Sequence, residues 1–105
     1  MYSTSPGMFP GEYAKPHDAL TQKVKLFRWG GDCYAYGLLA AGHVDLVVEA
    51  SLKLYDYAAL IPVITGAGGT ITDWKGKPLD MNSDGSVIAA GDAAIHRAAM
   101  RTLSS

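Results

Sequence analysis

The chain has 105 residues, of which 49% are hydrophobic and 18% are charged, a composition typical of one small globular domain. Nine basic and ten acidic residues leave a formal net charge of −1 without an evident basic face, so nucleic acid is a poor candidate partner. Charges interrupt the apolar runs before they reach membrane-spanning length, and a single cysteine excludes an internal disulfide framework. The first residues lack the pattern of a signal peptide, so we expect a cytoplasmic protein that has no contact with membranes.

The expected elements alternate between helix and strand along the chain. Residues 1–10 are rich in proline and are expected to be irregular, with room for one short strand. The other elements are expected, in chain order, as a helix over 12–22, a strand over 23–29, a helix over 32–42, a strand over 43–50, a helix over 55–69, short strands within 70–74 and 84–91, and a helix over 92–103. This alternation predicts an α/β domain in which helices pack on a layered sheet.

Local signals mark the ends of the expected helices. Asp32 and Asp92 stand at N-cap positions, and Gly42 stands where the second helix is expected to end. Pro16 fits the first helix only in its opening turn, where a missing N–H is tolerated. Pro62 is expected to bend the third helix unless that helix begins late.

Polar residues gather at the ends of two expected strands. Glu49 closes the second expected strand, which is nearly continuous in apolar residues and is therefore expected to be covered on both faces. Gly30, Gly31 and Asp32 follow the first strand, and Asp56 begins the helix after Glu49. Ligands bind at the carboxyl ends of strands in parallel α/β sheets. If these strands are parallel, the polar residues converge on one edge of the sheet.

Asp56 has two interpretations. An acid at a helix start interacts well with the helix dipole and caps exposed N–H groups. The alternative is a metal ligand, because Mg²⁺ prefers carboxylate oxygens and keeps waters and substrate phosphates as its other ligands. One carboxylate is too few for such a site, and further ligands would have to come from elsewhere.

Glu49 and Asp32 also leave alternatives open. Glu49 is either a strand-end acid in solvent or a hydrogen-bond acceptor for hydroxyl, amine or imidazole groups of a substrate. Asp32 is either a helix cap or a ligand-contacting residue. The three histidines show no metal-binding spacing, and we interpret them as packing or surface residues.

Two motifs together resemble the C-terminal half of the inositol monophosphatase superfamily. The first is the G-x-x-D-x-x-x-E spacing of Gly42, Asp45 and Glu49. The second is "YDYAALIPVITGAGG", which is similar to that family's aromatic-Asp signature ending in Gly-Gly. Within the superfamily, "GGDCYAYGLLAAGHVDLVVEA" and "STSPGMF" are most similar to the histidinol-phosphatase branch. The resemblance covers Ser3 to Leu79 and, more loosely, the last strand and helix.

The resemblance implies a Mg²⁺-dependent phosphomonoesterase with the fold of that C-terminal subdomain. It assigns a metal ligand to Asp56 and a substrate contact to Glu49, and it places Gly30, Gly31 and Asp32 along the substrate pocket. Family members are commonly dimers, and their substrates are small phosphate esters.

The chain departs from the family pattern because two metal-binding motifs are absent from it. The family's other metal ligands lie in an N-terminal half, in Gly-Glu-Glu and Asp-Pro-x-Asp-Gly-Thr motifs that are absent from these residues. Ser51 and Leu54 also differ from the histidinol-phosphatase pattern. One hypothesis is that residues 1–105 form the substrate-side part of a phosphatase, inactive alone, which binds Mg²⁺ only with the N-terminal half as partner. The alternative is a stand-alone, non-catalytic binding or oligomerisation module, which binds a small phosphate ester or a protein partner through its exposed edge. An isolated half is expected to self-associate, whereas a stand-alone module is expected to be monomeric.

Overall fold

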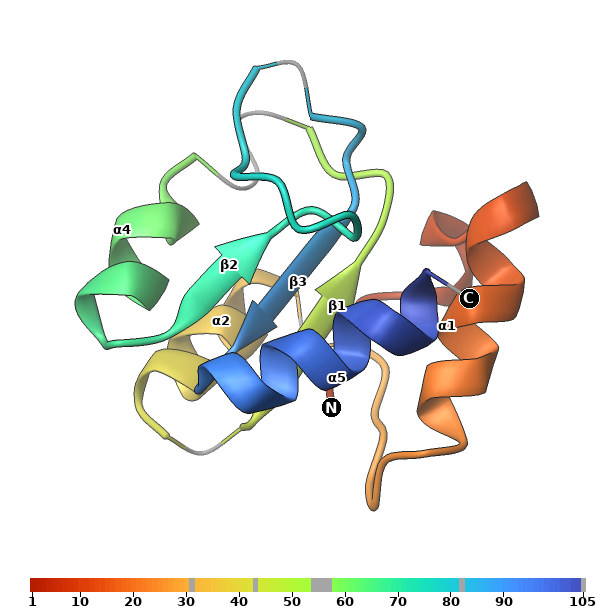
Figure 1. The fold of residues 1–105 in the computed structure, drawn as a ribbon, viewed down its shortest axis with the longest axis horizontal. Helices are drawn as coiled ribbons and strands as arrows, with labels where there is room; N and C mark the ends of the chain where they lie inside the picture. The colour runs from red at the N-terminus through yellow and green to blue at the C-terminus, as the bar shows by residue number, and fades with distance from the viewer. Residues whose placement is uncertain (31, 43, 54–57, 82, 105) are drawn as a thin grey trace.

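The structure is a computed structural model, and it describes residues 1–30, 32–42, 44–53, 58–81 and 83–104, with residues 32–34 described by their backbone alone. Helices cover both faces of a small sheet (Figure 1). This arrangement confirms the α/β class predicted from the sequence.

The central sheet has three strands in the order β1-β3-β2. β1 (Leu46–Glu49) and β2 (Thr70–Thr72) both pair antiparallel with β3 (Val87–Ala90), which lies between them. The described strands therefore do not form the parallel sheet on which the expected convergence of polar residues was conditional. β1 and β2 do run in the same direction and are joined through a helix, as the alternation predicted. The segment from β2 to β3 carries no helix among its described residues, so the chain turns back and β3 enters antiparallel.

A parallel bridge nevertheless occurs at the start of the chain. Tyr2 pairs in parallel with both Arg28 and Val47, and so lies between them. The expected strand over 23–29 is wrong, because Arg28 alone forms a bridge in that segment. Its partner is the short opening of the chain, which the 3-10 turn starting at Pro6 diverts after a few residues.

In the described part of the chain, α-helices lie on both sides of the sheet, and their ends follow the local signals of the sequence. α1 (Ala14–Thr21) follows the 3-10 turns Pro6–Met8 and Gly11–Tyr13, and it holds Pro16 in its first turn. α2 spans Asp32–Ala40. α4 (Leu60–Gly66) begins late, which also places Pro62 in a first turn. α5 (Ala93–Leu103) is capped by Asp92, whose Oδ1 accepts a 2.9 Å hydrogen bond from the Ile95 N–H. The Asp92 cap is confirmed.

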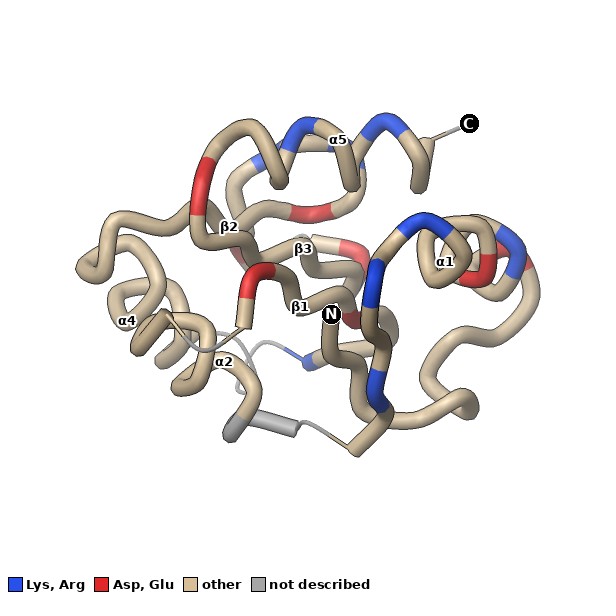
Figure 2. Tube along the Cα trace, turned by 90° about the horizontal axis from the view of Figure 1, so that it is seen from below, with Lys and Arg blue, Asp and Glu red and all other residues tan. Residues whose placement is uncertain are grey.

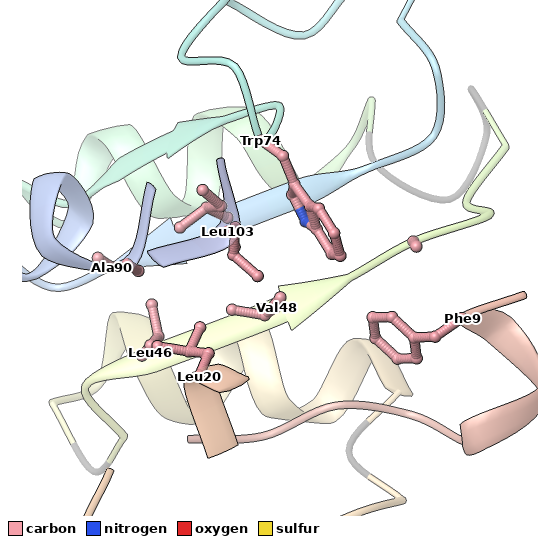
Figure 3. Close-up of a cluster of buried hydrophobic side chains, with 10 residues drawn as sticks. Phe9, Leu20, Leu46, Val48, Trp74, Ala90 and Leu103 are labelled. Atoms are coloured by element: carbon pink, nitrogen blue, oxygen red, sulfur yellow. The ribbon is translucent and has the colours of Figure 1, made fainter. Parts of the chain in front are cut away.

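The sheet is buried on both faces, as the apolar run before Glu49 predicted. Alternate residues of β1 face opposite ways, so Val48 belongs to one core and Val47 to the other. The first core joins the sheet to α1 and α5, and it contains Phe9, Leu20, Leu46, Val48, Ala50, Trp74, Ile88, Ala90, Ala99 and Leu103 (Figure 3). The second joins it to α2 and α4, and it contains Ala35, Tyr36, Leu39, Val47, Ile64, Ile71, Val87 and Ala89. Full burial of one Val or Leu side chain stabilises a fold by roughly 1.5–3 kcal/mol.

Charged residues are distributed over several elements. Lys and Arg positions occur on α5, on α1 and along the segment that follows α1, with Asp and Glu positions between them (Figure 2). None of the described helices combines the length and apolar character needed to cross a membrane.

Candidate functional site

A buried carboxylate lies at the end of β1. Glu49 is 0% exposed. Thr4 donates to both of its oxygens, with the hydroxyl 2.7 Å from Oε1 and the backbone N–H 3.3 Å from Oε2. Hydrogen bonds to a buried carboxylate offset part of the cost of removing its charge from water. The interpretation of Glu49 as an acid in solvent is therefore wrong, because the N-terminal segment folds over the strand end.

The same threonine holds the turn before α2. The N–H of Gly30 donates to the Thr4 carbonyl at 2.8 Å. Gly30 has φ +90°, a backbone conformation that favours glycine, and it is exposed. Gly30 and Glu49 therefore meet at Thr4. The parallel bridges of Tyr2 bring the segment before Gly30 and β1 to the same place, whereas Asp56, the third part of the predicted convergence, lies outside the described residues.

Ser3 anchors this segment from the inside of the domain. Its hydroxyl donates to the Val48 carbonyl at 2.6 Å and lies 2.9 Å from Nε2 of His17. Because the hydroxyl has a single proton, the second bond requires the Nε2–H of His17 to donate to Ser3 Oγ. Burial lowers the pKa of His17, against a smaller opposing effect of Asp18, which favours a neutral ring with its proton on Nε2.

Aromatic rings pack beside the end of β1. Trp74 donates its Nε1–H to the carbonyl of Glu49 at 3.1 Å and to that of Val87 at 3.3 Å. The ring of Phe9 lies between Trp74 and His17, with centroid distances of 6.2 Å and 3.9 Å. Trp74 and Phe9 can be followed near the tip of β1 in Figure 3. This packing fixes the backbone that carries Glu49.

The chain leaves β1 through an unusual backbone position. Ser51 has φ +62° and is the one non-glycine residue with positive φ in the described part of the chain. Its hydroxyl donates to the Met8 carbonyl at 2.9 Å. The next residue, Leu52, donates its N–H to the Gly85 carbonyl at 3.0 Å. These bonds fix the path of the chain immediately before residues 54–57.

The predicted site residues are described to different extents. The structure brings Glu49 and Gly30 together. It places Asp32 as the first residue of α2, by its backbone alone. Gly31 and Asp56 lie outside the described residues. Sequence reasoning missed Thr4, although the motif "STSPGMF" that contains it was recognised as part of the resemblance.

The described residues do not form a complete metal site. Across residues 1–30, 32–42, 44–53, 58–81 and 83–104, no three His, Cys, Asp or Glu side chains are grouped so that they could hold a metal ion.

Comparison with known proteins establishes the class. The family model described as the inositol monophosphatase family matches residues 3–105. The chain belongs to the inositol monophosphatase family.

Two curated relatives indicate the branch. The bifunctional phosphatase IMPL2, chloroplastic, of Arabidopsis thaliana is 50% identical over 110 residues, covering 98% of this chain and 32% of the relative. The histidinol-phosphatase of Chlorobaculum parvum is 35% identical over 74 residues, covering 70% of this chain and 29% of the relative. The chain thus spans about a third of the length of the curated relatives it matches.

Solved structures confirm the fold. An inositol monophosphatase from Zymomonas mobilis aligns with a TM-score of 0.95 and 47% identity, covering 99% of this chain and 41% of that one. The extragenic suppressor protein suhB from Bartonella henselae aligns with a TM-score of 0.82 and 26% identity, covering 97% and 39%. The three-layer arrangement of this chain is therefore that of one part of a larger inositol monophosphatase-like structure.

Proposed function

We propose that the chain supplies the substrate-side part of a Mg²⁺-dependent phosphomonoesterase that acts on histidinol phosphate or an inositol phosphate. The observation that carries the proposal is the meeting of Glu49 and Gly30 at Thr4. The resemblance assigns both residues to the substrate pocket. The 50% identity to a bifunctional phosphatase supports a phosphatase, and the 35% identity to a histidinol-phosphatase supports this class of substrate.

Each predicted residue has a proposed role at this site. Glu49 accepts hydrogen bonds from a hydroxyl, amine or imidazole group of the ester. Gly30, Gly31 and Asp32 line the pocket beside it. Asp56 gives one carboxylate to Mg²⁺, and residues outside this chain give the others. When bound, the ion neutralises charge on the phosphate, which is the main need of phosphoryl transfer.

The burial of Glu49 constrains how a substrate reaches it. A carboxylate that is 0% exposed accepts a bond from a ligand only after the atoms over it move. The exposed turn at Gly30 is hydrogen-bonded to the same threonine, which supports an approach from solvent on that side. We therefore propose that substrate enters beside Gly30.

The remaining proposals concern the chain by itself. We expect it to lack activity without the N-terminal half, to associate with that half or with a second copy, and to act in the cytoplasm.

The test uses the chain alone and a chimera. In the chimera, this chain replaces the matched region of the Arabidopsis bifunctional phosphatase. With Mg²⁺ and either histidinol phosphate or inositol monophosphate, we expect no turnover by the chain and clear release of phosphate by the chimera. Robust turnover by the chain alone would contradict the proposed inactivity, and an inactive but folded chimera would contradict the proposed function.

Two variants of the chimera test the metal ligand. Asp56→Asn removes one charged oxygen. At saturating Mg²⁺, it should lower the rate of phosphate release by at least about a hundredfold. Asp18→Asn is the matched control, because Asp18 is exposed on α1. Full activity of the Asp56→Asn chimera would refute the ligand role.

A further inference from the structure

Thr4 is the residue through which the buried carboxylate and the Gly30 turn are connected. Its hydroxyl and its N–H reach different oxygens of Glu49, at 2.7 Å and 3.3 Å. A carboxylate held at both oxygens by one residue cannot rotate about its last bond without breaking a hydrogen bond. Thr4 therefore contributes to the orientation of the Glu49 carboxylate.

Thr4 is itself held in place. The preceding residues are hydrogen-bonded on both sides: Tyr2 exchanges backbone bonds with Leu46 and Val48, and the Ser3 N–H donates to the Arg28 carbonyl at 3.1 Å. The carbonyl of Thr4 accepts from Gly30 at 2.8 Å. A β-branched side chain adds stiffness at χ1, so the hydroxyl has little freedom.

We propose that Thr4 is a positioning residue, which orients the Glu49 carboxylate toward the turn at Gly30 and thereby selects phosphate esters that carry a hydrogen-bond donor beside the phosphate. This inference rests on the proposed function, since it takes Glu49 as the substrate contact. It goes further in assigning the orientation of that contact, and part of the substrate preference, to a residue 45 positions away in the sequence.

A purely structural role makes a different prediction. If Thr4 only satisfied a buried charge, its loss would lower stability and would lower activity toward every ester to the same extent. If it orients Glu49, its loss acts on esters that bond to Glu49 and spares those that do not. Esters with and without a donor group therefore separate the two roles.

The first experiment is enzymatic and uses the chimera described above. Thr4→Val removes the hydroxyl but keeps the shape and the backbone N–H, whereas Thr4→Ser keeps the hydroxyl. For histidinol phosphate, Thr4→Val should lower kcat/KM about tenfold, because a bond to a charged group is lost. For p-nitrophenyl phosphate, which has no donor beside the phosphate, kcat/KM should stay within about twofold. Thr4→Ser, which keeps the hydroxyl, should retain most of the kcat/KM for histidinol phosphate.

The matched control is Thr21→Val. The hydroxyl of Thr21 bonds to the Asp18 carbonyl at the end of α1, at 2.7 Å, so it tests the loss of a threonine hydroxyl outside the site. It should leave kcat/KM unchanged for both esters. An equal loss for both esters in Thr4→Val, or no loss for either, overturns the inference.

The second experiment does not depend on activity. In the 105-residue chain, NMR couplings along the Glu49 side chain report whether it keeps one rotamer. We expect one rotamer in the unsubstituted chain and in Thr4→Ser, and averaging between rotamers in Thr4→Val. An unchanged single rotamer in Thr4→Val overturns the inference even if the chimera is inactive. An inactive chimera with the expected averaging contradicts the proposed function and leaves the positioning role supported.

Discussion

Trp74 donates its indole N–H to the main-chain carbonyl of Glu49 at 3.1 Å, and so ties the residue that carries the candidate substrate carboxylate to the loop after β2. The same N–H lies 3.3 Å from the Val87 carbonyl on the neighbouring strand. The indole therefore joins the ends of β1 and β3 at the point where the site begins.

Replacing Trp74 by phenylalanine should destabilise the fold strongly. The change leaves two buried carbonyls without this donor and opens a small cavity, which together predict a loss of about 2–4 kcal/mol in the free energy of unfolding. Urea denaturation followed by circular dichroism measures it. Trp29→Phe is the control, because Trp29 is 41% exposed, and it should cost about 1 kcal/mol or less. Equal losses would show that the indole bond contributes little.

The chain should be more stable with glycine than with alanine at position 51. Both substitutions remove the hydroxyl that bonds to Met8, but glycine alone adopts a φ near +62° without strain. The free energy of unfolding should therefore be about 1 kcal/mol higher in Ser51→Gly than in Ser51→Ala. Because the hydrogen bond is absent from both variants, their difference isolates the backbone effect. A difference near zero would indicate that residue 51 does not hold this backbone conformation in solution.

The N-cap of α5 should contribute measurably to stability. Asp92→Ala removes the side-chain bond to the Ile95 N–H, and it should lower the free energy of unfolding by about 1 kcal/mol. Asp92→Asn is the matched variant, because asparagine caps helices about as well and lacks only the charge. Thermal or urea unfolding should rank the unsubstituted chain and Asp92→Asn together, above Asp92→Ala. A similar loss in Asp92→Asn would show that the charge matters more than the cap.

Acid should destabilise the domain through its buried histidines. Burial lowers the pKa of His17, and burial with the nearby charge of Arg97 lowers that of His96, both from an ordinary value of 6.5. Between the lowered pKa and 6.5 the unfolded chain binds more protons than the folded chain, so stability rises with pH across that window. The stability is fully present above about pH 6.5 and is lost as the pH falls through the window.

This pH dependence can be checked by NMR titration of both rings and by urea denaturation between pH 5 and 7. The ring of His17 should stay neutral, with its Nε2–H donating to Ser3, until the pH falls below the ordinary histidine pKa of 6.5. In His96→Gln the slope of stability against pH should become smaller, and the His17 contribution should remain. A stability that is flat or rises toward acid would contradict the assignment.

The helices and the covering of the sheet on both faces were predictable because their signals are local. The caps, the glycine after α2 and the prolines act within one turn of chain, and the apolar run before Glu49 requires cover on both faces. The direction of β3 was not predictable, since pairing depends on what connects the strands rather than on the strand sequences. The strand expected over 23–29 is absent for the same reason. Only Arg28 of that segment forms a β-bridge.

The position of Glu49 at the end of a strand was predictable, and the residues that hold its side chain were not. Glu49 could be found from its position at a strand end and from the spacing to Asp45. Its burial could not be found, because the cover comes from Thr4, which lies 45 residues earlier and is an ordinary polar residue in an irregular segment. A side chain that acts by orienting another leaves no periodic trace in the sequence. Asp56 remains a prediction.

The place of Tyr2 between Arg28 and Val47 has a consequence for how the chain folds. The opening residues can pair only after β1 has been made, and the bond from Ser3 to Val48 closes a loop of 45 residues. Closing a loop of that length costs conformational entropy before the contact stabilises anything. The segment that positions the candidate substrate carboxylate should therefore be among the last to become ordered, and among the first to open when the domain is stressed.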